Sequence, residues 1–259
     1  VDFDDDMASV ELWFVDEAGA FTVETGIDEL SFPMDFWYLE IGDVGTEQHV
    51  VLNGISWTFS AGKIYGVVGF NGCGKTVLLK CICGMMPVDM GDVAIRRGDL
   101  TIGDRRGLFG IVIETAQFLE GESGMGNLKM LADIQGKIGK AEIAQAMQRV
   151  GLDPKSRMRV GKYSLGMRHR LAIAQAVMEN PPALLLDEPL NGLDHESVRQ
   201  VYELIQQSRD AGKIVLIASH HMEDIQLLCD EVLWLKDGKL CAVSDVNAYL
   251  DAKKEGIHS

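Results

Sequence analysis

The most constraining feature of the sequence is a glycine-rich segment at residues 69–76, which reads GFNGCGKT. It fits the pattern Gly-x-x-x-x-Gly-Lys-Ser/Thr that is typical of loops that bind phosphate. The short apolar segment before it, at 64–68, predicts a buried strand, and the segment after it, at 77–82, predicts a helix. A strand, a glycine-rich loop and a helix in this order predict an α/β fold with a phosphate site. The alternative, a plain glycine-rich turn after a strand, is disfavoured by this context.

The residue types in the loop suit a bound phosphate group. Glycines allow the backbone to curl so that successive N–H groups point at phosphate oxygens, and the positive end of the next helix faces the same anion. Lys75 supplies a charge for the β- and γ-phosphates of a nucleotide, and the Thr76 hydroxyl can ligate Mg²⁺. The residues expected to bind the nucleotide here are Gly69, Asn71, Gly72, Cys73, Gly74, Lys75, Thr76 and Val77. We also expect the pKa of the Cys73 thiol to be lowered by the helix N-terminus and Lys75.

A pair of carboxylates follows a second apolar segment, at residues 183–186. Apolar residues at every position predict a strand that is buried on both faces. Asp187 and Glu188 then emerge at its carboxyl end, where open α/β sheets bind ligands. We expect Asp187 to hold Mg²⁺ and Glu188 to polarise an attacking water molecule. Carboxylates after a strand are also common as helix caps, but the phosphate loop upstream favours the metal-binding interpretation.

These residues resemble the nucleotide-binding subunit of ABC transporters, over about residues 32–243. The discriminating motif is YSLGMR at residues 163–168, which resembles the family signature usually written LSGGQ. Its Ser164 lies 23 residues before Asp187, as the family pattern expects. The resemblance implies that Ser164 and Gly166 contact the γ-phosphate that is held on the phosphate loop of another protomer. A serine at a helix start can bind an anion in this way, although it can equally be an ordinary helix N-cap.

Two further segments match the family. Residues 191–194 (NGLD) resemble the D-loop that crosses the dimer interface. His220 resembles the switch histidine that contacts the γ-phosphate. His221 is the competing candidate, and we favour His220 because it directly follows Ala218-Ser219, as in the family pattern.

Three features depart from the family pattern. Glu114 stands where the family has the glutamine of the Q-loop, and Leu165 and Met167 replace the glycine and glutamine of the signature. These two substituted motifs resemble the corresponding motifs of bacterial exporters of the bacitracin and lantibiotic-immunity type. The third departure is that no aromatic residue is suitably placed to stack on adenine, since Trp37 and Tyr38 are expected to lie in a strand core.

The resemblance implies an ATP-hydrolysing subunit that powers export through a separate membrane-spanning permease subunit. Two ATP-binding subunits would close head to tail around two ATP molecules with Mg²⁺. Water would attack the γ-phosphate in line, with Glu188, His220 and Lys75 as catalytic residues, and Glu114 would link nucleotide to permease. One alternative is a regulatory subunit that binds ATP without hydrolysing it. A soluble ABC ATPase of DNA repair or translation fits less well, because only 89 residues separate Lys75 from Ser164 and the chain has a single cassette.

The expected fold is α/β: a P-loop NTPase core with a mainly parallel sheet, an antiparallel β-subdomain and an inserted α-helical subdomain at about 115–180. The ABC domain is expected at 32–259. Before it, residues 1–31 form an acidic extension with two β-like runs, which predict either a hairpin or a disordered tail. The other expected strands are at 36–41, 50–59, 63–69, 183–186, 214–218, 231–236 and 239–243. The expected helices are at 77–82, 141–150, 164–180 and 195–209.

The charge distribution argues against two classes of partner. The 39 acidic residues outnumber the 24 basic residues, and the excess lies in residues 1–62, which hold 14 acidic residues and no lysine or arginine. Without a basic stripe or a polybasic patch, the chain is not expected to bind nucleic acid or anionic lipid as its main partner.

Other features of the sequence predict a cytoplasmic protein. No segment approaches the roughly 18 consecutive apolar residues that a membrane span needs, and the first residues lack the pattern of a signal peptide. Five cysteines, an odd number, indicate reduced thiols rather than a disulfide framework. The resemblance further implies a peripheral position at the inner face of the cell membrane.

Overall fold

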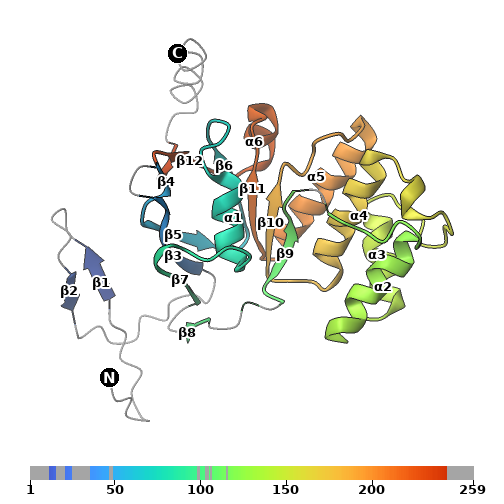
Figure 1. Ribbon diagram of the computed structural model, residues 1–259, viewed down its shortest axis with the longest axis horizontal. Helices are drawn as coiled ribbons and strands as arrows, with labels where there is room; N and C mark the ends of the chain where they lie inside the picture. The colour runs from blue at the N-terminus through green and yellow to red at the C-terminus, as the bar shows by residue number, and fades with distance from the viewer. Residues whose placement is uncertain are drawn as a thin grey trace.

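The computed structural model describes residues 12–15, 21–24, 36–46, 49–97, 100–102, 105, 107–114 and 116–243 of the 259 residues. At its centre is a six-stranded sheet in the order β13-β12-β6-β11-β10-β9 (Figure 1). The strands are β6 (Lys63–Val68), β9 (Phe109–Val112), β10 (Ala183–Asp187), β11 (Ile214–Ala218), β12 (Glu231–Lys236) and β13 (Lys239–Ala242). Neighbours from β12 to β9 are parallel, and β13 pairs antiparallel with β12.

A second, antiparallel sheet forms the β-subdomain. Its longest strand, β3 (Phe36–Thr46), pairs with β4 (His49–Leu52), β5 (Ile55–Ser60) and β7 (Met90–Arg97), and β7 also pairs with β8 (Leu100–Thr101). Trp37 of β3 is buried and packs edge-on against Phe109 of β9, with ring centroids 5.8 Å apart. The expectation that Trp37 belongs to a strand core is therefore confirmed, and Tyr38 beside it is half-buried.

The helices flank the central sheet. α1 (Lys75–Cys83) follows β6, α5 (His195–Asp210) connects β10 to β11, and α6 (Met222–Leu228) connects β11 to β12. α2 (Gly124–Gln135), α3 (Lys140–Arg149) and α4 (Leu165–Met178) group together beside β9, with a 3-10 helix at Val160–Lys162 before α4 (Figure 1). None of the helices within the described ranges is long and apolar enough to cross a bilayer.

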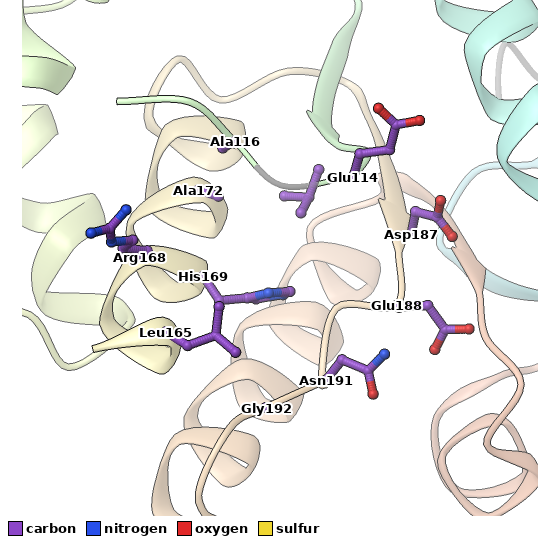
Figure 2. A pocket seen from close by; sticks show the side chains of 11 residues that line it. Glu114, Ala116, Leu165, Arg168, His169, Ala172, Asp187, Glu188, Asn191 and Gly192 are labelled. Atoms are coloured by element: carbon purple, nitrogen blue, oxygen red, sulfur yellow. The ribbon is translucent and has the colours of Figure 1, made fainter. Parts of the chain in front are cut away.

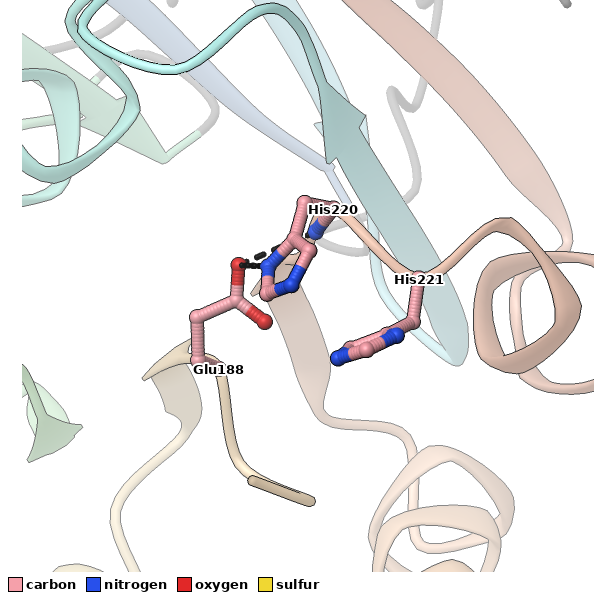
Figure 3. Close-up of side chains that lie close together, drawn as sticks. All are labelled: Glu188, His220 and His221. Atoms are coloured by element: carbon pink, nitrogen blue, oxygen red, sulfur yellow. Dashed lines mark hydrogen bonds and ion pairs between the residues drawn. The ribbon is translucent and has the colours of Figure 1, made fainter. Parts of the chain in front are cut away.

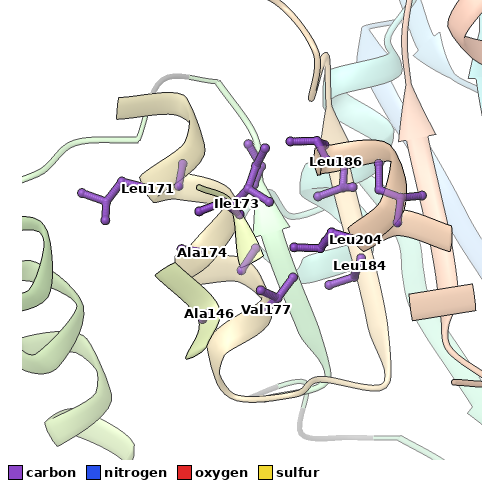
Figure 4. Packing of buried hydrophobic residues seen from close by; sticks show 14 of the residues in the cluster. Ala146, Leu171, Ile173, Ala174, Val177, Leu184, Leu186 and Leu204 are labelled. Atoms are coloured by element: carbon purple, nitrogen blue, oxygen red, sulfur yellow. The ribbon is translucent and has the colours of Figure 1, made fainter. Parts of the chain in front are cut away.

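The central strands are apolar because both faces of the sheet are covered. β6, β10 and β11 are buried along nearly their whole length. Alternate residues of a strand point to opposite faces. In β10, Leu184 and Leu186 pack with Ile173 of α4 and Leu204 of α5 (Figure 4). Leu185 belongs instead to the cluster on the other face, which α1 and the antiparallel sheet cover.

The N-terminal extension is described only in part. β1 (Leu12–Val15) and β2 (Phe21–Glu24) pair antiparallel. The rest of the extension at 1–31 lies outside the described residues, as do residues 244–259. The division of the chain at residue 31 therefore stays a prediction.

Most of the expected elements are confirmed, with bounds within two residues of the prediction for α3, α4, α5, β10, β11, β12 and β13. The run expected at 50–59 is two strands, because the chain turns at Asn53 and Gly54 between β4 and β5. The sequence patterns did not predict β7, β8, β9 or α6. The apolar and polar residues of β7 do not alternate, and β8, β9 and α6 are only two, four and seven residues long.

Gly110 of β9 lies directly against the backbone of α4. A Cβ atom at this position would overlap the carbonyl oxygen of Ala176. The strand and the helix can approach this closely only because no side chain separates them. We expect Gly110→Ala to push α4 away from β9 and to lower the free energy of unfolding by about 1–3 kcal/mol, as measured by urea denaturation.

The matched control is Gly121→Ala, because a Cβ atom at Gly121 meets no atom within 4 Å. This variant should change the free energy of unfolding by less than about 0.5 kcal/mol. Equal destabilisation by the two substitutions would contradict the role of the close contact between β9 and α4.

Candidate functional site

The candidate site lies at the carboxyl edge of the parallel sheet. Since β6, β11, β10 and β9 are parallel neighbours, their carboxyl ends meet at one edge, and the loops that follow them lie side by side. The register pairs Asp187 at the end of β10 with Ala218 at the end of β11. Ala218 is paired in turn with Val67 of β6, which leads into the phosphate loop.

The predicted phosphate loop connects β6 to α1. The exposure of the predicted nucleotide-binding residues varies along the loop and the first turn of α1. Two glycines are buried, Gly69 and Gly74, and Asn71 and Gly72 are exposed. The half-buried residues are Cys73, Lys75, Thr76 and Val77. Gly74 precedes α1 with a φ of 104°, and a Cβ atom there would press against Val51. Only glycine fits this position without strain. No side chain caps α1 and its first turn has no acidic residue, so the positive end of the helix is open to an anion.

The Lys75 side chain folds back over the loop. Its ammonium group donates hydrogen bonds to the carbonyl oxygens of Gly69, at 2.9 Å, and Phe70, at 3.3 Å. The cation is therefore held directly above the curled backbone. An anion bound in the loop would meet both the helix N-terminus and this charge.

A hydrogen bond joins α1 to the end of β10. The Thr76 hydroxyl donates to Oδ2 of Asp187 at 2.6 Å. Burial raises the pKa of the Asp187 carboxyl, and the hydrogen bond from Thr76 opposes this increase. The pair presents a hydroxyl and a carboxylate oxygen close together, and both are the hard oxygen donors that Mg²⁺ prefers. These residues fit a magnesium ion beside the phosphate loop.

Glu188 is fixed by the segment that follows β11 (Figure 3). Its φ of 49° is uncommon for a residue with a side chain. The carboxylate accepts hydrogen bonds from the Ser219 hydroxyl, at 3.1 Å, and from the backbone N–H of His220, at 2.9 Å. Nδ1 of His220 lies 2.6 Å from the same carboxylate. Two residues predicted to be catalytic are thus in direct contact.

His221, the competing candidate for the switch histidine, lies beside this pair. Its ring centroid is 4.0 Å from that of His220. Its Nε2 is 3.2 Å from Oδ1 of Asn191 in the predicted D-loop. The imidazole of His220 contacts Glu188, whereas that of His221 contacts Asn191, so the geometry favours His220 as the partner of the carboxylate.

Glu114 follows β9 in a left-handed conformation, with a φ of 58°. Its carboxylate forms an ion pair with Lys80 of α1, with an N–O distance of 2.5 Å. Lys80 is not among the site residues that the sequence predicts. The available signal was its place in the predicted helix, four residues after Thr76 and so on the same face of the helix.

Ser164 and Gly166 lie apart from the phosphate loop of their own chain. Ser164 is exposed and is the N-cap of α4, where its hydroxyl accepts the backbone N–H of Met167 at 3.1 Å. The next residue, Leu165, is 67% exposed. In Figure 1 the strands β9 to β11 separate α4 from α1. The structure therefore brings together the predicted residues at the sheet edge, but not Ser164 and Gly166 of the signature motif.

A cavity of about 420 Å³ lies between α4 and the ends of β9 and β10 (Figure 2). Glu114, Asp187 and Glu188 line one side, and His169 of α4 faces them. The Nε2 atom of His169 is buried and has no hydrogen-bond partner among the described residues. Burial lowers the pKa of His169, although a hydrogen bond with the Pro189 backbone opposes the decrease. His169 is likewise not among the site residues that the sequence predicts.

The expected decrease in the pKa of Cys73 is wrong. Burial raises the pKa of its thiol, and the nearby Lys75 opposes the increase without reversing it. A Cβ atom added to Gly69 would collide with the sulfur, which shows that the thiol points into the loop interior. The sequence showed the helix N-terminus and the lysine but not the direction of the side chain.

Comparison with known proteins places this site in a family. The sequence profile described as ABC transporter matches residues 52–191, which include the phosphate loop, Ser164 and the carboxylates after β10. The chain belongs to the ABC transporter family. The ABC transporter ATP-binding protein YybJ of Bacillus subtilis, itself described as uncharacterized, is 40% identical over 73% of this chain and 88% of its own length.

Two other ABC relatives carry more specific descriptions. The bacitracin transport ATP-binding protein BcrA of Enterococcus faecalis is 35% identical over 76% of this chain, a match that spans only 64% of BcrA. The lantibiotic transport ATP-binding protein SrtF of Streptococcus pyogenes is 28% identical over 74% of this chain and 83% of SrtF. The predicted resemblance to this group is confirmed.

A solved ABC structure supports the fold. The protein described as the ATP binding subunit of an ABC transporter superposes with a TM-score of 0.71 over 83% of this chain and 93% of the other, at 22% identity. The expected P-loop NTPase fold, with a mainly parallel sheet, is confirmed. The chain is an ATP-binding subunit of the ABC transporter family.

The half-buried His169 should make the stability of this ABC subunit depend on pH. Since its pKa is lowered in the folded state, the unfolded chain binds a proton more readily once the pH falls below the ordinary value of 6.5. Protonation then favours unfolding, so this contribution to stability decreases as the pH falls. We expect the free energy of unfolding of His169→Gln to fall less than that of the parent between about pH 7 and pH 5.

Urea denaturation at several pH values measures this difference. The same replacement at the exposed His195, His195→Gln, shows what the loss of one imidazole does by itself. An identical decrease for the parent and His169→Gln would contradict the proposed effect of burial.

Proposed function

We propose that this ABC subunit binds and hydrolyses ATP with Mg²⁺ and powers export through a separate permease subunit. The observation that carries the proposal is the convergence of three groups at one edge of the sheet. These are the loop with Lys75, the Thr76–Asp187 pair, and the Glu188–His220 pair. Each alone has a structural explanation, but together they supply charge stabilisation, metal ligands and a positioned carboxylate.

The nucleotide would bind through its phosphates. The backbone of residues 69–76 and the N-terminus of α1 provide N–H donors, and Lys75 provides a charge beside the β- and γ-phosphates. Thr76 and Asp187 would hold Mg²⁺, which neutralises part of the phosphate charge when it is bound. Since α1 has no capping side chain and no acidic residue in its first turn, none of its own side chains competes with the phosphates for this helix end.

Hydrolysis would use Glu188 to orient or deprotonate the attacking water. The carboxylate is held by Ser219 and His220, so it is already oriented before a substrate binds. His220 would contact the γ-phosphate from the end of β11, and Lys75 from the loop. The catalytic contribution of these residues is positioning and charge stabilisation, which is what phosphoryl transfer mainly requires.

A second copy of an ATP-binding subunit would complete each site. Ser164 and Gly166 stand at the exposed N-terminus of α4, away from the phosphate loop of their own chain. A head-to-tail dimer would place this helix end against the γ-phosphate of the partner. The exposed Leu165 beside it suits a surface that becomes buried on association.

The permease would contact a groove next to Glu114. This groove, of about 390 Å³, runs between the end of α1, β9 and α2, and its lining includes Met85, Ile113 and Ile134. Ile134 is 79% exposed and Met85 is 63% exposed, and adjoining exposed apolar side chains are typical of an interaction surface. A permease segment seated there would place this subunit at the inner face of the membrane and lie beside the Glu114–Lys80 pair.

The catalytic assignment can be tested with Glu188→Gln. The substitution keeps the size of the side chain but removes its basic carboxylate, so turnover should fall by roughly 10²–10⁴. ATP binding should persist, because the phosphate loop is untouched. Uncleaved ATP should then hold two protomers together, visible as a dimer in size-exclusion chromatography with Mg-ATP.

Two variants control this experiment. Adding Ser164→Arg to Glu188→Gln should return the protein to a monomer, because the signature helix can no longer approach the phosphate. Glu203→Gln makes the same chemical change on α5, away from the site, and should keep the parent rate. Hydrolysis by Glu188→Gln at the parent rate would show that another group activates the water.

The permease groove can be tested with Ile134→Glu. A charge at this exposed apolar position should reduce recovery of the membrane partner in pull-downs from the native host, while ATP hydrolysis by the isolated subunit stays near the parent rate. Met130→Glu, on the same helix but outside the groove, is the matched control. Equal recovery with both variants would place the permease contact elsewhere.

A further inference from the structure

The proposed function leaves one side chain of the site without a role, the imidazole of His221. It follows His220 at the end of β11 and lies next to Glu188 (Figure 3). One ligand atom from each of Glu188, His220 and His221 can be chosen so that all three lie within 4.8 Å of one another. Two imidazole nitrogens and one carboxylate oxygen form a common ligand set for Zn²⁺.

The three side chains need only small movements to reach the ligand spacing around a bound ion. Around a tetrahedral Zn²⁺, with bonds of about 2.0–2.2 Å, neighbouring ligand atoms lie roughly 3.3 Å apart. Glu188 and His220 are closer than this, at 2.6 Å, so their contact must open slightly. His221 has to move inward by roughly 1 Å or more, which its exposed side chain permits by rotation. The fourth position would hold water or the side-chain oxygen of Asn191, which already lies 3.2 Å from His221.

We propose that Glu188, His220 and His221 form a binding site for a divalent transition metal, and specifically for Zn²⁺. The site differs in chemistry from the Thr76–Asp187 pair, which offers only oxygen atoms and suits Mg²⁺. Imidazole ligands favour zinc over magnesium, so Mg²⁺ at the nucleotide does not compete for this position. Neutral His220 can bind through Nδ1 when its proton is carried on Nε2.

Zinc at this position inhibits ATP hydrolysis. A Glu188 carboxylate that ligates Zn²⁺ cannot accept a proton from water, and His220 is turned away from the γ-phosphate. This consequence rests on the proposed function, whereas the metal site itself rests on the positions of the three side chains. The two parts can therefore fail separately.

The metal site is tested on the metal-free full chain by titration calorimetry with Zn²⁺. We expect each chain to bind one Zn²⁺ ion in a way that requires His221. In His221→Asn this binding should weaken by at least about tenfold. His195→Asn, the same replacement at the start of α5, is the matched control and should bind as the parent does. Since the five cysteines can also bind zinc, only the component lost in His221→Asn counts as this site.

Co²⁺ provides an independent readout, because a tetrahedral histidine-carboxylate site gives intense visible absorption that His221→Asn should lose. Circular dichroism should show that His221→Asn is folded. Parent protein that binds no Zn²⁺, or His221→Asn that binds it as tightly as the parent, would overturn the site.

The inhibition is tested with Mg-ATP and increasing Zn²⁺. The parent should lose activity, and His221→Asn, whose basal turnover should be unchanged, should need at least about tenfold more Zn²⁺ for the same loss. Equal sensitivity of the two proteins would overturn the inhibitory role. A metal-free parent that hydrolyses no ATP would contradict the proposed function instead, and the binding titration would still decide the metal site.

Discussion

The structure depends on the burial of β6, β10 and β11 on both faces. Strands that must be apolar on both sides can carry polar groups only where they end. Because these strands are parallel, the ends that lead into the loop, into Glu188 and into His220 lie at the same edge. The parallel pairing of these buried strands therefore determines both the packing of the core and the position of the candidate site. A shift in strand register would displace the whole site.

The parts of the fold that were predictable from the sequence are those with a strong local signal. The phosphate loop and the apolar segment before Asp187 each carry residue types that few other structures use. β7 and β9 were missed because their pairing depends on β3 and β10, which are far away in the sequence. A strand such as β9, with Gly110 where a side chain would be expected, shows its role only against Ala176 of α4.

The sequence likewise predicted only part of the candidate site. Spacing alone predicted Lys75, Thr76, Asp187 and Glu188 as a group, and the hydrogen bond between Thr76 and Asp187 is the kind of contact that this prediction requires. The directions of side chains could not be predicted. Cys73 points into the loop, so burial outweighs the lysine in setting its pKa. The ion pair of Glu114 with Lys80 likewise depends on how β9 lies against α1.

The contact between Gly110 and Ala176 has a mechanical consequence. No side chain lies between the strand and the helix at this point, so the two backbones are in direct contact, and a close-packed interior transmits displacements. We therefore expect a displacement of α4 at this contact to displace β9 as well. Ser164 caps the N-terminus of α4, and the chain reaches Glu114 shortly after β9. The contact at Gly110 therefore mechanically couples the signature serine to Glu114.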